Sequence, residues 1–174
     1  RVFVAFDLLS NVLMVAMAGA VYVVFRLHAR PLALFAAFGL LAAGLTSMVI
    51  VMTGFALDSM AHEFVTASEA DADIVATSAR GFALVGAFGR DVGLTFIGMG
   101  ILLLGVLIVW SGAVHRVLGW VAIPAGVLLP LHYLRLVNED LVYIARAGLI
   151  ATLVFLLATG IWLLVRGTQE APAD

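Results

Sequence analysis

The chain has 174 residues, of which 64% are hydrophobic and 11% are charged. Its nine Lys and Arg positions are all arginine, its formal net charge is −2, and it has no cysteine. These numbers exclude disulfides and thiolate metal sites, and the lack of a basic tract argues against a nucleic-acid partner. A soluble domain of this size cannot bury so much apolar surface, so we expect lipid to surround the chain.

Five apolar stretches, each long enough to cross a bilayer, follow one another along the chain. We expect one all-α domain over residues 1–166, a polytopic transmembrane helical bundle, with a polar tail over residues 167–174. The chain starts without Met and apolar residues begin at once, so either a sixth N-terminal helix is missing or the numbering starts after processing. The expected spans cover about residues 2–27, 31–57, 81–110, 117–136 and 140–166.

Polar residues mark the joins between these spans. Pro31 suits the first turn of the second span, where its missing N–H costs nothing. Residues 58–80 are the one long polar stretch, and we expect one or two short outer helices there. The apolar ends of the neighbouring spans should bury one another beneath this segment in a compact outer cap.

The arginines predict how the chain is oriented. Five spans put the two ends of the chain on opposite sides of the membrane. One side of the membrane has short loops, and no acid appears there before Glu170. The arginines expected on this side are Arg26, Arg30, Arg116 and Arg166. We therefore place this side, with the C-terminus, in the cytoplasm.

Ionisable residues near the opposite side are expected at one level. Counting back from Arg26 at about 1.5 Å per helical residue reaches Asp7 after about 29 Å, close to the roughly 30 Å hydrocarbon thickness. Similar counts on the other spans give the same outer level, whose members are Asp7, Arg90, Asp91, Arg135 and Arg146.

Two interpretations of this level remain open. In the first, the charged side chains mark the outer interface, reach water and pair loosely. In the second, helix tilt carries them inward to form an ion-pair network between helices. Asn11 lies one turn below Asp7 and Tyr143 lies between Glu139 and Arg146 on one helix face, so both would extend such a network. The candidate polar network is Asp7, Asn11, Arg90, Asp91, Arg135, Glu139 and Arg146.

Glycines recur at helical spacing on the third span. Small residues let membrane helices approach closely, although glycine is also simply more frequent in such helices. Two stripes with seven-residue spacing predict that this span is the central helix, with neighbours on two sides. The candidate packing residues are Gly86, Gly89, Gly93, Gly98, Gly100 and Gly105.

The histidines are the main candidates for ligands. His62 and His132 are expected at the outer side, where together they suggest a haem pair, the weakest of our function hypotheses. His62, Glu63 and His132, with Asp140, suggest a metal site, but interface histidines more often meet water or a carbonyl. No serine has a recognisable companion base, and there is no phosphate loop. We expect no cofactor and no metal, and the sequence leans against an enzyme.

One stretch resembles a known family. It comprises the glycine-rich residues 91–105, followed by Trp110-Ser-Gly112 and by Val117-Leu-Gly119-Trp120. It is similar to a bacterial domain of unknown function, number four-three-eight-six, over residues 91–127. The resemblance implies a six-helix inner-membrane protein, with one more N-terminal helix and often Pro at the position of His115. It implies no activity and no site residues.

The sequence therefore favours a multi-pass protein of the bacterial plasma membrane without enzymatic activity. Our leading hypothesis is a small membrane subunit or scaffold that binds lipid, a partner protein or another copy of itself through its helix faces and outer cap. The alternative is a small-molecule or proton carrier that uses the outer Asp and Arg residues.

Overall fold

The structure is a computed structural model that describes residues 2–136 and 142–169. Its elements are the helices α1 (Val2–Thr66), α2 (Glu69–Ser111), α3 (Arg116–Leu128) and α4 (Val142–Gln169), with a 3-10 helix η1 (Pro130–Leu136). The described residues form no strand, so the all-α prediction is confirmed. Three helices are long and apolar enough to cross a membrane, namely α1, α2 and the helix that covers Arg116–Tyr133. The number of five spans stays a prediction.

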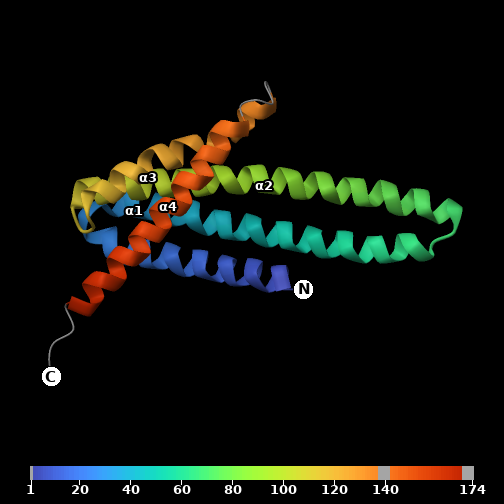
Figure 1. Ribbon diagram of the computed structural model, residues 1–174, viewed down its shortest axis with the longest axis horizontal. Helices are drawn as coiled ribbons and strands as arrows, with labels where there is room; N and C mark the ends of the chain where they lie inside the picture. The colour runs from blue at the N-terminus through green and yellow to red at the C-terminus, as the bar shows by residue number, and fades with distance from the viewer. Residues whose placement is uncertain (1, 137–141, 170–174) are drawn as a thin grey trace.

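Helix α1 consists of two helical segments that fold back on each other. Ala29 leaves helical geometry, with φ −155° and ψ 78°, and Pro31 follows within the first turn of the next segment. The two segments, residues 2–28 and 30–66, then run antiparallel (Figure 1). An ideal Cβ on Gly44 would lie 3.4 Å from Cγ2 of Val15, so the segments touch near their middle.

The second segment of α1 and the whole of α2 form one long hairpin (Figure 1). Its tip is at Ser68, which caps α2: the Ser68 hydroxyl accepts a hydrogen bond from the Asp71 N–H at 3.4 Å and donates one to Asp71 Oδ2 at 2.6 Å. Residues 58–66 thus continue α1, and the rest of the polar stretch opens α2. The predicted short outer helices and compact cap are wrong, because continuous helices satisfy the backbone through the whole polar stretch.

A tight turn connects α2 to α3. Gly112 ends α2 with φ 64°, a left-handed conformation that only glycine adopts readily, and its N–H donates to Ile108 O at 3.0 Å. His115 caps α3, and its Nδ1 accepts from Val117 N–H at 3.4 Å. Helix α4 then crosses the bundle obliquely (Figure 1). The expected polar tail begins inside α4, which ends at Gln169, and residues 170–174 lie outside the described part.

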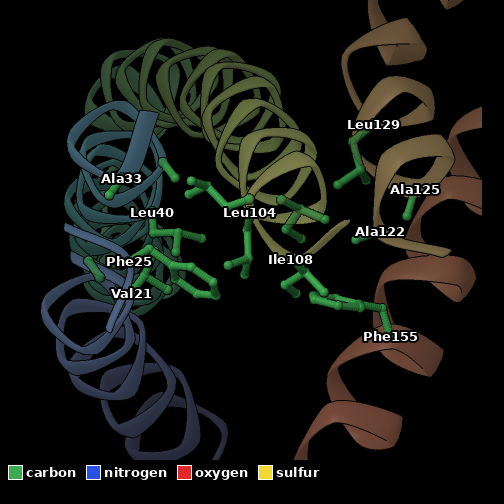
Figure 2. Packing of buried hydrophobic residues seen from close by; sticks show 14 residues of the cluster. Val21, Phe25, Ala33, Leu40, Leu104, Ile108, Ala122, Ala125, Leu129 and Phe155 are labelled. Carbon is green, nitrogen blue, oxygen red and sulfur yellow. The ribbon is translucent and has the colours of Figure 1, made fainter. Parts of the chain in front are cut away.

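Helix α2 is at the centre of the core, with α1 on one side and α3 and α4 on the other (Figure 2). The core lies near the end of the bundle that contains the turn between α2 and α3. Alanine is frequent in it, because small side chains let the helices approach. Its labelled members in Figure 2 are Val21, Phe25, Ala33, Leu40, Leu104, Ile108, Ala122, Ala125, Leu129 and Phe155.

Candidate functional site: a buried Asp–His pair at the base of a helical arm

One stripe of α2 glycines faces the second segment of α1. An ideal Cβ on Gly100 would lie 3.1 Å from the backbone nitrogen of Leu40, and one on Gly93 would lie 3.1 Å from Oγ1 of Thr46. The contacts nearer the tip of the hairpin follow the same antiparallel register. At Gly89 the nearest neighbour is the Ile50 side chain, at 3.4 Å, and at Gly86 it is Thr53 Oγ1, at 3.0 Å.

The second stripe of α2 glycines faces α3. An ideal Cβ on Gly98 would meet Gly126 O at 2.7 Å, and one on Gly105 would meet Gly119 O at 2.9 Å. Helix α3 therefore carries two glycines of its own, seven residues apart, that match the two on α2. The spacing of Gly119 and Gly126 is visible in the sequence, but they were not among the predicted packing residues.

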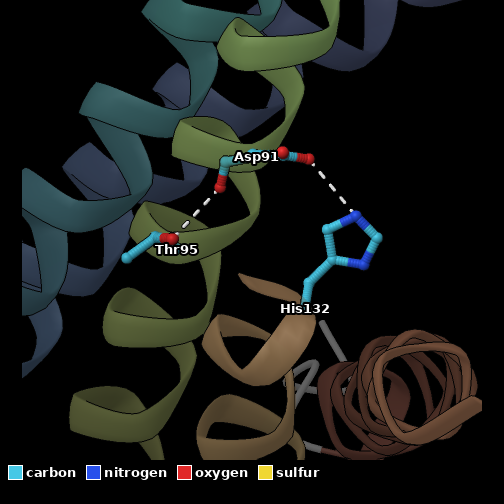
Figure 3. Close-up of polar contacts among 3 residues, drawn as sticks. All are labelled: Asp91, Thr95 and His132. Atoms are coloured by element: carbon cyan, nitrogen blue, oxygen red, sulfur yellow. Dashed lines mark hydrogen bonds and ion pairs between the residues drawn. The ribbon is translucent and has the colours of Figure 1, made fainter. Parts of the chain in front are cut away.

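These two lines of close helix contact, here called the α1–α2 seam and the α2–α3 seam, position Asp91 and His132. Asp91 lies on α2 two residues before Gly93, and His132 lies on η1, which follows the seam with α3. The distance between Asp91 Oδ1 and His132 Nε2 is 3.2 Å, and their side chains are 10% and 13% exposed (Figure 3). Two lone-pair acceptors repel each other at this distance, so a favourable contact needs a proton on His132 Nε2 or on the Asp91 carboxyl.

Hydrogen bonds on α2 hold the backbone beside this pair in helical geometry. The hydroxyl of Thr95 donates to the carbonyl oxygen of Asp91 at 3.1 Å (Figure 3). This bond lies within one turn of α2, and it leaves the Asp91 carboxylate pointing toward η1. A buried carboxylate beside a histidine is an arrangement that can bind and release a proton.

Asn11 lies at about the same height in the bundle as Asp91. The Asn11 carbonyl is 3.7 Å from an ideal Cβ on Gly44, while Thr46, further along the same helix, faces Gly93. Asn11 is 2% exposed, and its side-chain nitrogen has no hydrogen-bond partner among the described residues. Of the predicted network, the structure thus brings Asn11 and Asp91 to one level inside the bundle.

Among the side chains that it describes, the structure does not bring the other charged members of the predicted network to this buried level. Arg90 and Arg146 are exposed, and the Arg146 guanidinium lies 5.4 Å from the centre of the Tyr143 ring in a cation–π contact. Glu139 lies outside the described residues. Asp7 lies on α1 and Arg135 on η1, but their side chains are not described.

The histidine pair suggested for haem does not form. His62 is exposed in the distal part of α1, whereas His132 is buried beside Asp91. In the register of the first seam, His62 lies roughly 20 Å further along the hairpin than Asp91. The shared level expected for the two histidines is therefore wrong. The metal site suggested from His62, Glu63 and His132 fails for the same reason, and Asp140 lies outside the described residues.

The hairpin continues well beyond the Asp91–His132 pair. We call residues 50–66 of α1 and 69–90 of α2 the outer arm, which extends past α3 and α4 (Figure 1). Several large apolar side chains on it are exposed: Phe55, Phe64, Ile74, Leu84 and Phe88. Among the arm residues whose exposure the structure describes, the exposed acids are Asp58, Glu63, Asp71 and Asp73, and the exposed arginines are Arg80 and Arg90.

The pairing of Asp91 with His132 was not expected from the sequence, which assigned His132 to a metal or haem ligand set. The only signal was that the sequence placed Asp91 at the outer level and, separately, His132 near the outer side of the membrane. Thr46 and Thr53 were also missed as packing residues, although they are seven residues apart, like the glycines they face.

Comparisons with known proteins give one match. Residues 1–167 match a family described as a domain of unknown function, DUF4386. No curated protein and no solved structure matches the chain.

Proposed function

The chain belongs to the DUF4386 family, and from its structure we propose that it is a non-enzymatic membrane subunit that binds a partner protein through the outer arm. Three of its helices have the length and apolar composition to cross a membrane. The observation that carries the proposal is the exposed apolar surface of the outer arm. The arm lies beyond the length of helix that is needed to cross a bilayer.

Helix length supports this reading. At about 1.5 Å per residue, residues 30–66 are roughly 55 Å long and the 43 residues of α2 are roughly 65 Å long. A hydrocarbon layer is about 30 Å thick. If the end with the turn at Gly112 lies at one membrane surface, the layer ends near Ile50 and Arg90, and the outer arm stands beyond it.

The surface of the arm indicates the chemistry of its partner. Leu84 is 72% exposed and Phe88 is 67% exposed, and both lie on α2 beyond Asp91. Large apolar side chains held in water favour an interface, because burying them against a partner releases the water around them. The four exposed acids against two arginines favour a partner whose surface is apolar with a basic rim.

A photo-crosslinking experiment tests the proposal in native membranes. A photoreactive amino acid is placed at Leu84 or Phe88, and at Leu153 on α4 as the matched control, which is also exposed and apolar. We expect a protein adduct of one discrete mass from each arm position and lipid adducts alone from position 153. An adduct of twice the chain mass identifies the partner as another copy. The absence of protein adducts at both arm positions contradicts the proposal.

The Asp91–His132 pair favours a second candidate function, a proton carrier. Its support is the buried carboxylate next to a histidine, with the unpartnered amide nitrogen of Asn11 at the same level. The test is proton uptake into proteoliposomes driven by a potassium diffusion potential. A carrier shows uptake that Asp91→Asn removes and Asp73→Asn, an exposed acid on the arm, leaves intact. Uptake no faster than in protein-free liposomes rejects this candidate.

Both candidates share one orientation. We place the end with Arg26, Arg30 and Arg116 in the cytoplasm of a bacterial cell, in the inner membrane, because short arginine-bearing loops without acids are retained on that side. The outer arm then faces the opposite compartment.

A further inference from the structure

A groove separates the first segment of α1 from α4 near the arginine-rich end of the bundle. It has a volume of about 190 Å³. Its walls include Ala20 and Val24 from α1 and Leu156 and Thr159 from α4, and its floor includes Leu104 and Ile108 from α2. Apart from Thr159, the lining residues are apolar. Such a groove matches the chemistry of a hydrocarbon chain.

A polar pocket adjoins this groove at the end of the bundle. It has a volume of about 450 Å³ and is lined by Gly112, Val114, His115, Arg116 and Trp162. Val114 lines both spaces, and Trp162 lies one turn beyond Thr159 on α4. The apolar groove therefore leads directly to Arg116 and His115.

The charge around this pocket is of one sign. Arg26, His28 and Arg30 are exposed at the bend of α1, and His28 lines a neighbouring pocket with Trp110 and Ser111. The sequence has no Asp or Glu in residues 8–57, 92–138 or 141–169. Among the residues that the structure describes, these segments contain no acid that could neutralise Arg116, so the described charges favour an anion here.

Thr159 is the polar residue of the groove wall, but its hydroxyl oxygen contributes no surface to the groove. Its hydroxyl is buried and has no hydrogen-bond partner among the described residues. Thr159 therefore marks where the apolar wall gives way to the basic pocket, and the polar contacts for a headgroup come from His115 and Arg116.

We propose that this groove and pocket form a binding site for one anionic phospholipid, with an acyl chain between α1 and α4 and the phosphate at Arg116. The site is independent of the outer arm and of the Asp91–His132 pair, which lie toward the other end of the bundle. A zwitterionic phospholipid has the same acyl chains but a neutral headgroup, so it fits the groove and gains less from the arginines.

Fluorescence quenching by brominated lipids tests this site in vesicles. The full chain with Trp110→Phe and Trp120→Phe keeps Trp162, on the wall of the basic pocket, as its sole tryptophan. It is reconstituted in phosphatidylcholine that contains increasing fractions of brominated phosphatidylglycerol or brominated phosphatidylcholine. We expect about fivefold tighter apparent binding of the phosphatidylglycerol, the factor that one arginine gives near an anionic lipid.

Two matched pairs of variants locate the effect. Arg116→Gln should abolish the preference for phosphatidylglycerol, whereas Arg80→Gln on the outer arm should keep it. Ala20→Phe fills the groove and should reduce quenching by both lipids, whereas Ala16→Phe, one turn earlier and also exposed, should not. Equal quenching by the two lipids in the parent protein overturns the proposal. A preference that survives Arg116→Gln overturns it as well, and the groove variants decide whether any acyl chain enters.

Discussion

Asp91 and His132 come from different helical elements, yet Asp91 Oδ1 and His132 Nε2 lie 3.2 Å apart with both side chains almost completely buried. The contact links the middle of α2 to η1, directly after the seam between α2 and α3. The close packing of α3 on α2 fixes the spacing of the two backbones. The contact between Asp91 and His132 therefore depends on the correct packing of α3.

Removing either partner of this pair should destabilise the bundle. Asp91→Asn or His132→Gln leaves a buried polar group with a poorer partner, at an expected cost of about 1–3 kcal/mol each. The double variant should cost less than the sum of the single ones, because the pair is then lost only once. Thermal unfolding in detergent measures all three, and strictly additive costs would show that the two side chains are not coupled.

The seam between α2 and α3 should not tolerate a methyl group. In Gly126→Ala the new Cβ would lie 2.6 Å from Gly98 O, a backbone atom that can move only with its helix. We expect a loss of about 1–3 kcal/mol in stability. Gly160→Ala on α4 is the control, because nothing lies within 4 Å of its Cβ, and it should be neutral or stabilising by up to about 1 kcal/mol. Equal effects of Gly126→Ala and Gly160→Ala on the unfolding temperature would contradict the close packing of α2 against α3.

The contact between α1 and α2 should be more forgiving at Gly86. The Cβ of Gly86→Ala would meet the Thr53 hydroxyl at 3.0 Å, a side-chain atom rather than backbone. We expect a cost of about 1 kcal/mol, near the lower limit for overpacking. Adding Thr53→Ala removes that hydroxyl and should restore part of the lost stability. Thermal unfolding of the double variant against each single one measures this recovery, and its absence would place the strain elsewhere.

Gly112 should be replaceable by Asn more easily than by Ala. Its φ of 64° is the left-handed conformation, which costs a residue with a Cβ roughly 1–2 kcal/mol. Asn tolerates this conformation better than Ala does, because its side chain can hydrogen-bond locally. Gly112→Ala should therefore lower the unfolding temperature by more than Gly112→Asn. The reverse order would mean that the turn changes its geometry when Gly112 is replaced.

Much of the fold was predictable from local features of the sequence. The apolar composition and the lack of strand alternation led to an all-helical fold, which the structure confirms, and residues 91–127 carried the resemblance to the family that residues 1–167 match. The polar stretch 58–80 was predicted to end the flanking helices, but α1 and α2 continue through it apart from a short turn at Ser68. Helical hydrogen bonds are made within the segment, so a helix can continue through residues whose side chains are polar.

The partners of individual side chains required the tertiary structure. The spacing of Gly86, Gly93 and Gly100 shows in the sequence that one face of a helix is smooth, but not which helix covers it. Asp91 and His132 are both visible in the sequence as polar residues in apolar surroundings. Their contact depends on the register of α3 against α2, and that register arises from close packing between residues far apart in the chain, which no local pattern encodes.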